Sequence, residues 1–143
     1  MKVVTAMLCN HAVVHSGLLT IVDGGITRSW APNLPSRLSM WLAVQMGLEP
    51  SELGKPHEVR VLFLNPDNVR VAQLVSAVQA EKHPKHEDGE RVLVPLAVSL
   101  LPVNFEKYGR HSVTIMVDSK VSRVLEFWLQ HPDERVLPPI QLP

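Results

Sequence analysis

The sequence lacks the features that mark several large classes of protein. Its 143 residues include one cysteine, so no internal disulfide framework can form. No apolar run reaches the length of about 18 residues that a membrane-spanning helix needs. The 14 basic and 14 acidic residues cancel, so no overall field attracts nucleic acid or an anionic membrane. We therefore expect neither nucleic acid nor a membrane as a partner.

The first residues form a poor targeting signal. The apolar run at residues 3–9 is barely long enough for a secretory signal, and Leu8 stands where a lipoprotein signal has a small residue before its cysteine. The free thiol of Cys9 is compatible with a reducing compartment. We expect an intact cytoplasmic protein whose first segment is a strand.

What the sequence does contain favours β structure. Hydrophobic residues make up 45% of the chain, and valine far outnumbers alanine. Valine suits a pleated surface, whereas alanine is the best helix former. The 12 prolines and 7 glycines have no period and separate short segments. This composition predicts one all-β domain over residues 1–130, followed by a proline-rich C-terminal tail over residues 131–143.

Alternation of apolar and polar residues locates the strands. The clearest is residues 37–46, and residues 69–81 are read as a strand, although a helical stripe also fits them. The turn signal Asp23-Gly24-Gly25 predicts that residues 26–30 pair back on the preceding strand. Pro95 places its strand at an edge or a bulge. The full set expected is residues 2–9, 17–22, 26–30, 37–46, 57–64, 69–81, 91–100, 111–118 and 121–129, with one possible helical turn at residues 49–53.

Short strands separated by turn signals predict a β-sandwich or a barrel. The layout resembles an uncharacterised bacterial family of small all-β proteins, through Ala6-Met7-Leu8-Cys9, the hairpin at residues 17–25 and the closing segment 103–109. That closing segment also looks like the last hairpin of immunoglobulin-like and C2-like sandwiches, with His111 where an aromatic residue is usual. The resemblance implies a single antiparallel β-sandwich of about eight strands, immunoglobulin-like or C2-like, and no activity.

Large apolar residues on faces turned away from the core are the candidate interaction residues. Tryptophan is enriched at protein interfaces, so these residues indicate a surface that binds a second copy or another protein. The alternative is that residues 48–53 or the tail cover the same face from within the chain. The candidates are Trp30, Trp41, Trp128, Leu62 and Leu64, joined by Met7 and Leu101. The apolar residues 136–143 could likewise dock along a neighbouring chain.

Polar loops offer a second reading, a small-ligand or metal site. His83 and His86, with Asp88, are weak candidates for a zinc or nickel site. Asp67, Asp88 and Asp118 each lie in a turn, and a calcium site would require such loops to converge. We expect no bound cofactor.

The sequence provides no catalytic constellation. Cys9 and His11 could share a strand face, but no paired acid and base and no activated nucleophile can be assigned. We therefore expect a non-enzymatic interaction or accessory protein that assembles through its off-core apolar surface. The alternative is a ligand-binding or metal-binding sandwich that uses its loops.

Overall fold

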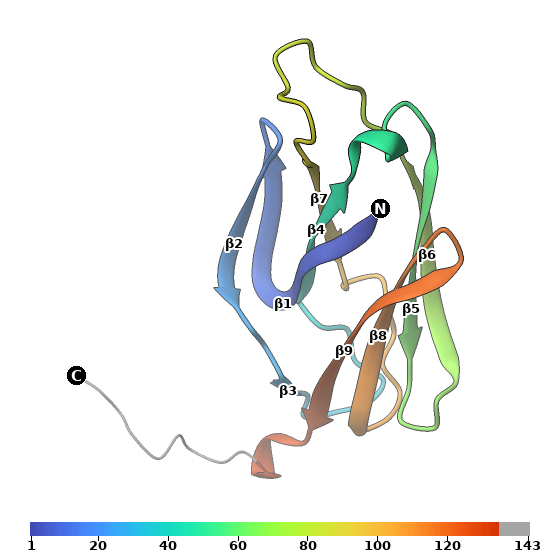
Figure 1. Cartoon of the computed structure of the whole chain (residues 1–143). Helices are drawn as coiled ribbons and strands as arrows, with labels where there is room; N and C mark the ends of the chain where they lie inside the picture. The colour runs from blue at the N-terminus through green and yellow to red at the C-terminus, as the bar shows by residue number, and fades with distance from the viewer. Residues whose placement is uncertain (135–143) are drawn as a thin grey trace, which may run out of the picture.

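The computed structural model describes residues 1–134, which form two β-sheets and contain no α-helix (Figure 1). The expected tail continues into residues 135–143, which lie outside the described residues. The strands are β1 (Lys2–His15), β2 (Leu18–Gly24), β3 (Arg28–Trp30), β4 (Trp41–Leu48), β5 (His57–Leu64), β6 (Arg70–Val78), β7 (Val92–Ser99), β8 (Gly109–Val117) and β9 (Lys120–Gln130). Two short 3-10 helices, η1 (Pro50–Glu52) and η2 (Pro132–Glu134), complete the described part of the chain.

The strands divide into a four-stranded sheet of order β2-β1-β4-β7 and a five-stranded sheet of order β3-β9-β8-β5-β6. In Figure 1 the four-stranded sheet lies on the left and the five-stranded sheet on the right. The four-stranded sheet is strongly curled, so that its two end strands β2 and β7 contact each other. Every pairing is antiparallel except that of β3 with β9, which departs from the expected all-antiparallel order.

One hydrophobic core takes side chains from both sheets. Strict alternation buries Val59, Val61 and Phe63 on β5, as the sequence predicted. The same period buries Val113 and Ile115 on β8. The all-β architecture follows from this period, since one face of each central strand must be removed from water.

Residues 37–40 do not belong to a strand, although Leu38 and Met40 are buried as the alternation predicted. The chain crosses here between the sheets, held by a single bridge from Ser36 to Phe105 and by Leu100, whose N–H donates to the Met40 carbonyl. No neighbouring strand is available until Trp41. The alternation of apolar residues therefore predicts correctly which side chains are buried, but it places the start of the strand too early.

The first hairpin turns later than the sequence indicated. Strand β1 continues to His15, and Ser16 and Gly17 form the turn with φ of 51° and 73°, the left-handed geometry of a tight hairpin. The expected turn at Asp23-Gly24-Gly25 does not form, because Asp23 and Gly24 are the last residues of β2. Asp23 and Gly25 have φ of 51° and 90°, and the chain continues from here to the other sheet. The prediction that residues 26–30 pair back on β2 is wrong, because β3 pairs with β9 instead.

Three further predictions are confirmed. The ambiguous segment after the Asn65 turn is strand β6. The expected helical turn is η1. Pro95 lies on β7, the end strand of the four-stranded sheet. This strand pairs only with β4, so a proline without an N–H is tolerated there.

Candidate interaction surface

The outer face of the five-stranded sheet is formed by the residues that alternate with the core. The register places Leu62 beside Thr114, which in turn lies beside Val124. Leu64 begins the next row of the same face. Both candidate leucines therefore lie half-buried on one surface that no other segment among residues 1–134 pairs with or crosses as a strand.

A hollow of about 370 Å³ lies on this outer face, beside the turn between β5 and β6. Leu64 and Val124 provide apolar walls. Arg110 and Glu126 form its charged side, with Nη1 and Oε1 3.9 Å apart. A shallow hollow with apolar walls and mutually compensated charges is suited to receiving a side chain of a partner rather than to polarising a substrate.

Trp128 lies on the same outer face, 36% exposed, while its neighbours Phe127 and Leu129 are fully buried. Strand pairing places Arg28 on one side of it and Arg110 on the other. The Arg28 guanidinium carbon lies 5.6 Å from the centre of the indole, a cation–π contact. Tryptophan and arginine are the residue types that most often carry binding energy at interfaces.

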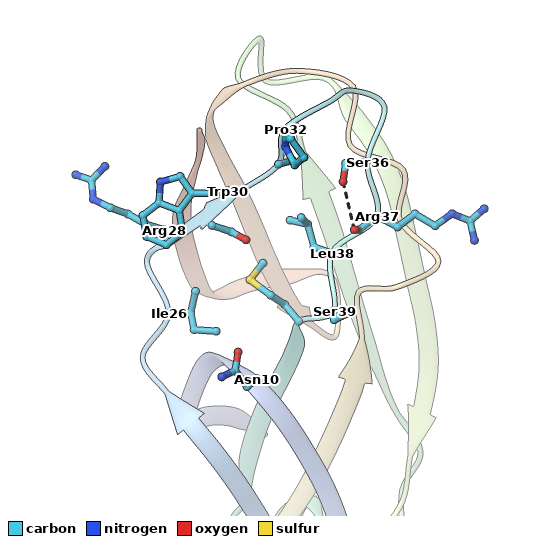
Figure 2. A pocket seen from close by; sticks show the side chains of 12 residues that line it. Asn10, Ile26, Arg28, Trp30, Pro32, Ser36, Arg37, Leu38 and Ser39 are labelled. Atoms are coloured by element: carbon cyan, nitrogen blue, oxygen red, sulfur yellow. Dashed lines mark hydrogen bonds between the residues drawn. The ribbon is translucent and has the colours of Figure 1, made fainter. Parts of the chain in front are cut away.

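Trp30 lies at the edge of this sheet and lines a second hollow of about 480 Å³ (Figure 2). Ile26 and Leu38 also line the hollow, and Figure 2 shows Arg28 and Arg37 extending away from it on opposite sides. No charged side chain among these lining residues is directed into the space. The hollow therefore has the walls of an apolar cleft and lacks convergent chemical groups.

Trp41 lies on the outer side of the other sheet, so the structure does not bring it together with Trp128. It packs against a second small cluster that contains Cys9 and Ala43, and the ring of His11 meets its indole edge-on at 5.0 Å. Strand β2 adds Leu19 and Ile21, and Met7, another of the off-core residues, packs there too. The curl of the sheet thus provides Trp41 with neighbours that the sequence pattern did not reveal.

The Cys9 thiol is not arranged as a nucleophile. It is fully buried, and its Sγ donates to the Trp41 carbonyl at 3.6 Å. Burial raises the pKa of the Cys9 thiol, which disfavours the reactive thiolate.

One polar constellation escaped the sequence analysis. The buried His57 lies 2.7 Å through Nδ1 from Asp118 Oδ2, and its Nε2 donates to the Glu52 carbonyl at 2.8 Å. The hydrogen bond from His57 holds the pKa of the Asp118 carboxyl below its usual range. Both ring nitrogens face acceptor oxygens, and neither is left to exchange a proton with a substrate. The sequence did hold one sign of this contact. His57 lies two residues before the inward-facing Val59, so its side chain is expected on the buried face of β5.

The loop residues do not assemble a metal centre in the described part of the chain. His83 Nδ1 accepts from the Lys85 backbone N–H, His86 Nδ1 accepts from the His83 backbone N–H, and Asp88 lies 4.0 Å from Lys82 Nζ. Residues 1–134 contain no group of three His, Cys, Asp or Glu side chains that could hold a metal ion.

Two of the aspartates proposed for calcium, Asp67 and Asp118, lie at opposite ends of β5. The turn with Asp67 follows the end of β5, whereas Asp118 hydrogen-bonds to the Glu58 N–H at the start of β5. The loop convergence that a calcium site requires is therefore not met by these two residues.

The fold and site define an all-β protein of two sheets whose five-stranded sheet has an outer face of mixed apolar and charged side chains. The chain belongs to a family of unknown function (DUF6941), whose family model matches residues 4–129. This membership confirms the resemblance to an uncharacterised family of small all-β proteins. A comparison with curated proteins finds no match.

A solved structure of the alkylpurine DNA glycosylase AlkC from Pseudomonas fluorescens, bound to DNA containing an abasic site analog, is similar to this chain at 14% identity. The similarity covers 87% of this chain and 30% of that chain, with a TM-score of 0.38. The expectation of protein partners to the exclusion of nucleic acid is corrected by this finding, because a DNA-bound protein is among the similar structures. Overlap this low provides no argument about what this chain binds.

No helix within residues 1–134 has the length and apolar character to cross a membrane.

Proposed function

We propose that this chain is a non-enzymatic interaction module that uses the outer face of its five-stranded sheet. The observation that carries the proposal is the exposed Trp128, flanked by Arg28 and Arg110 on a face that also presents Leu62 and Leu64. A large ring held by neighbouring strands loses little side-chain entropy on binding, and the hollow beside Leu64 can receive a partner side chain.

The absence of an assembled reaction centre among residues 1–134 supports a binding role. His57 uses both ring nitrogens in hydrogen bonds, and the buried Cys9 is disfavoured as a thiolate. Neither group can act as base or nucleophile without a rearrangement of its surroundings.

The two sheets, in this proposal, pack as an immunoglobulin-like sandwich. The order β6-β5-β8-β9 corresponds to strands C′-C-F-G of a variable-type immunoglobulin domain, and β1-β4-β7 corresponds to A-B-E. The common core that joins both sheets supports face-to-face packing. Nuclear Overhauser contacts between Leu42 and Ile115 methyl groups, one from each sheet, test this packing.

The working location in this proposal is the bacterial cytoplasm. The support is the buried free thiol of Cys9, which suits a reducing compartment. Fractionation of the native host tests it.

The experiment for the binding role is affinity capture from the native host with the wild-type chain and two variants. Trp128→Ala removes the exposed ring, and Val13→Ala, a similarly exposed residue on β1, is the matched control. We expect partners that the wild type and Val13→Ala retain to be lost with Trp128→Ala, while all three proteins melt at similar temperatures. Identical partner sets from all three would overturn the proposal. Nuclease treatment before capture shows whether any retained complex depends on nucleic acid.

A further inference from the structure

The hollow beside Trp30 has apolar walls from two segments of the chain. Ile26 and Trp30 are half-buried there, while Leu38 and Met40 are buried. Its volume of about 480 Å³ lies within the range of small-ligand sites, about 300–1,000 Å³. The hollow is therefore large enough for several apolar side chains of one bound segment.

The chain leaves its last strand beside this hollow. Trp30 pairs with Gln130 near the end of β9, and the N–H of Ala31, which also lines the hollow, donates to the Gln130 carbonyl at 3.0 Å. The Tyr108 hydroxyl donates to the Ala31 carbonyl at 2.6 Å, and the Tyr108 ring meets that of His131 edge-on, with the ring centres 6.2 Å apart. The short helix η2 follows and adds only about 6 Å along its axis (Figure 1). The chain beyond residue 134 therefore begins next to the hollow.

The sequence of residues 135–143, outside the described residues, matches such a hollow in its pattern. It contains three prolines and one charged residue. Proline favours the polyproline II helix, which repeats every three residues. At this period both polar residues, Arg135 and Gln141, fall on one edge of the helix. The other two edges are entirely apolar, with Leu137, Ile140 and Pro143 on one and Val136, Pro139 and Leu142 on the other.

We propose that residues 135–143 dock in the hollow beside Trp30 of the same chain as a polyproline II segment. The two apolar edges face the hollow, and the edge with Gln141 faces water. Aromatic-lined grooves are a common binding site for such segments, because the helix is already extended and loses little conformational entropy when it binds.

The length of the segment and its covalent attachment favour this occupant. At about 3.1 Å per residue, residues 135–143 extend over about 28 Å. A hollow of this volume is only about 10 Å across, so the segment is long enough to cross it. A short tether gives an effective concentration of about millimolar, so an affinity too weak for a free peptide is sufficient within one chain.

The hollow beside Leu64 is a poorer match for the same segment. Its lining includes the polar side chains of Asn65, Asn68, Ser112 and Thr114. An apolar edge placed over these groups would take them out of water without providing hydrogen-bond partners, which is unfavourable.

This inference goes beyond the proposed function, because it concerns a different surface. Trp30 becomes a contact within the chain, whereas the outer face with Trp128 stays open for a partner. Trp128 does not line the hollow, so the capture experiment and the docking experiment can fail independently.

The test is a spin label on the polar edge of the segment in the full chain. Gln141→Cys carries a nitroxide, and the fully buried Cys9 does not compete for it. We expect the label to broaden the methyl signal of Met40, which lines the hollow. The Met116 methyl is the control, because Met116 lies at the far end of β8 from the end of β9, and it should stay sharp. A sharp Met40 signal, or stronger broadening at Leu64 than at Met40, would overturn the inference.

A mixed sample distinguishes docking within one chain from docking on a second copy. Spin-labelled chains are mixed with equal amounts of methyl-labelled chains that carry no nitroxide. The Met40 signal should stay sharp in this mixture. Broadening would show that the segment binds a second copy, and the intramolecular docking would be wrong.

A pair of variants tests whether the apolar edges make the contact. Ile140→Asp, in the spin-labelled chain, places a charge on an apolar edge and should reduce the broadening at Met40 to the level at Met116. Ile140→Val keeps the edge apolar, is the matched control and should retain the broadening. Neither change removes a contact among residues 1–134, so the described fold is the same in both. Equal broadening in the two variants would refute the docking of this edge.

Discussion

The ring of His111 stacks on Phe127, with the ring centres 5.3 Å and the planes 18° apart. Phe105 meets the histidine edge-on, also with the ring centres 5.3 Å apart, and the two phenylalanine rings contact each other. The Nε2–H of His111 donates to the Lys107 carbonyl at 2.8 Å. His111 thus fills an aromatic position of the core in its neutral form, and this explains how a histidine can stand where the sequence comparison favours an aromatic residue.

This arrangement makes stability depend on pH. Burial lowers the pKa of His111 from its usual value of 6.5. The unfolded chain therefore takes up a proton before the folded one, so the contribution is complete above about pH 6.5 and is lost as the pH falls toward the folded-state value. We expect the free energy of unfolding, measured in urea, to decline between about pH 7 and pH 5.

His111→Phe should remove most of this decline, because the phenyl ring keeps the stack and takes up no proton. The Lys107 carbonyl loses its donor, so the variant need not be more stable at neutral pH. His15→Phe, at an exposed position, is the matched control and should keep the wild-type pH profile. An unchanged profile in His111→Phe would contradict the assignment.

The contact between His57 and Asp118 predicts a second dependence, at lower pH. The pKa of Asp118 is held below its usual value of 3.8, mainly by the hydrogen bond from His57. A carboxyl with a lowered folded pKa stabilises the fold above its unfolded pKa and loses that effect as the pH falls through the folded value. Asp118→Ala should therefore lower the melting temperature at about pH 7 more than at about pH 2.

The matched control is Asp88→Ala, whose carboxylate is fully exposed and lies 4.0 Å from a lysine. That change should have a small and nearly constant effect, since exposed ion pairs contribute little. Equal losses for Asp118→Ala at both pH values would show that the turn geometry, and not the carboxylate charge, determines the effect.

Alternation alone predicted most of the core and part of the candidate surface. The pattern on β5 assigned Val61 inward and Leu62 outward, and the pattern on β9 assigned Phe127 inward and Trp128 outward. Such patterns are reliable because side chains on a strand point alternately to its two faces.

The connections could not be predicted in the same way. The pairing of β3 with β9 joins residues about a hundred positions apart, and a period of two does not identify a neighbour. For the same reason Trp41 and Trp128 look equivalent in the sequence, although they lie on different sheets. The contact of His57 with Asp118 is likewise made by a turn distant in the chain.

Adjacent residues of β9 allow the two faces to be compared directly. Phe127 is fully buried and contacts Phe105 edge-on at 5.7 Å, whereas Trp128 is 36% exposed. Phe127→Ala should lower the free energy of unfolding by about 3–5 kcal/mol, because it removes buried area and leaves a cavity. Trp128→Ala should cost less, about 1–2 kcal/mol, since its side chain is only partly removed from water in the folded state. Chemical denaturation of both variants at one pH measures the difference. Similar losses for the two would mean that Trp128 stabilises the folded monomer, and its ring would then be unsuitable as the centre of an interaction surface.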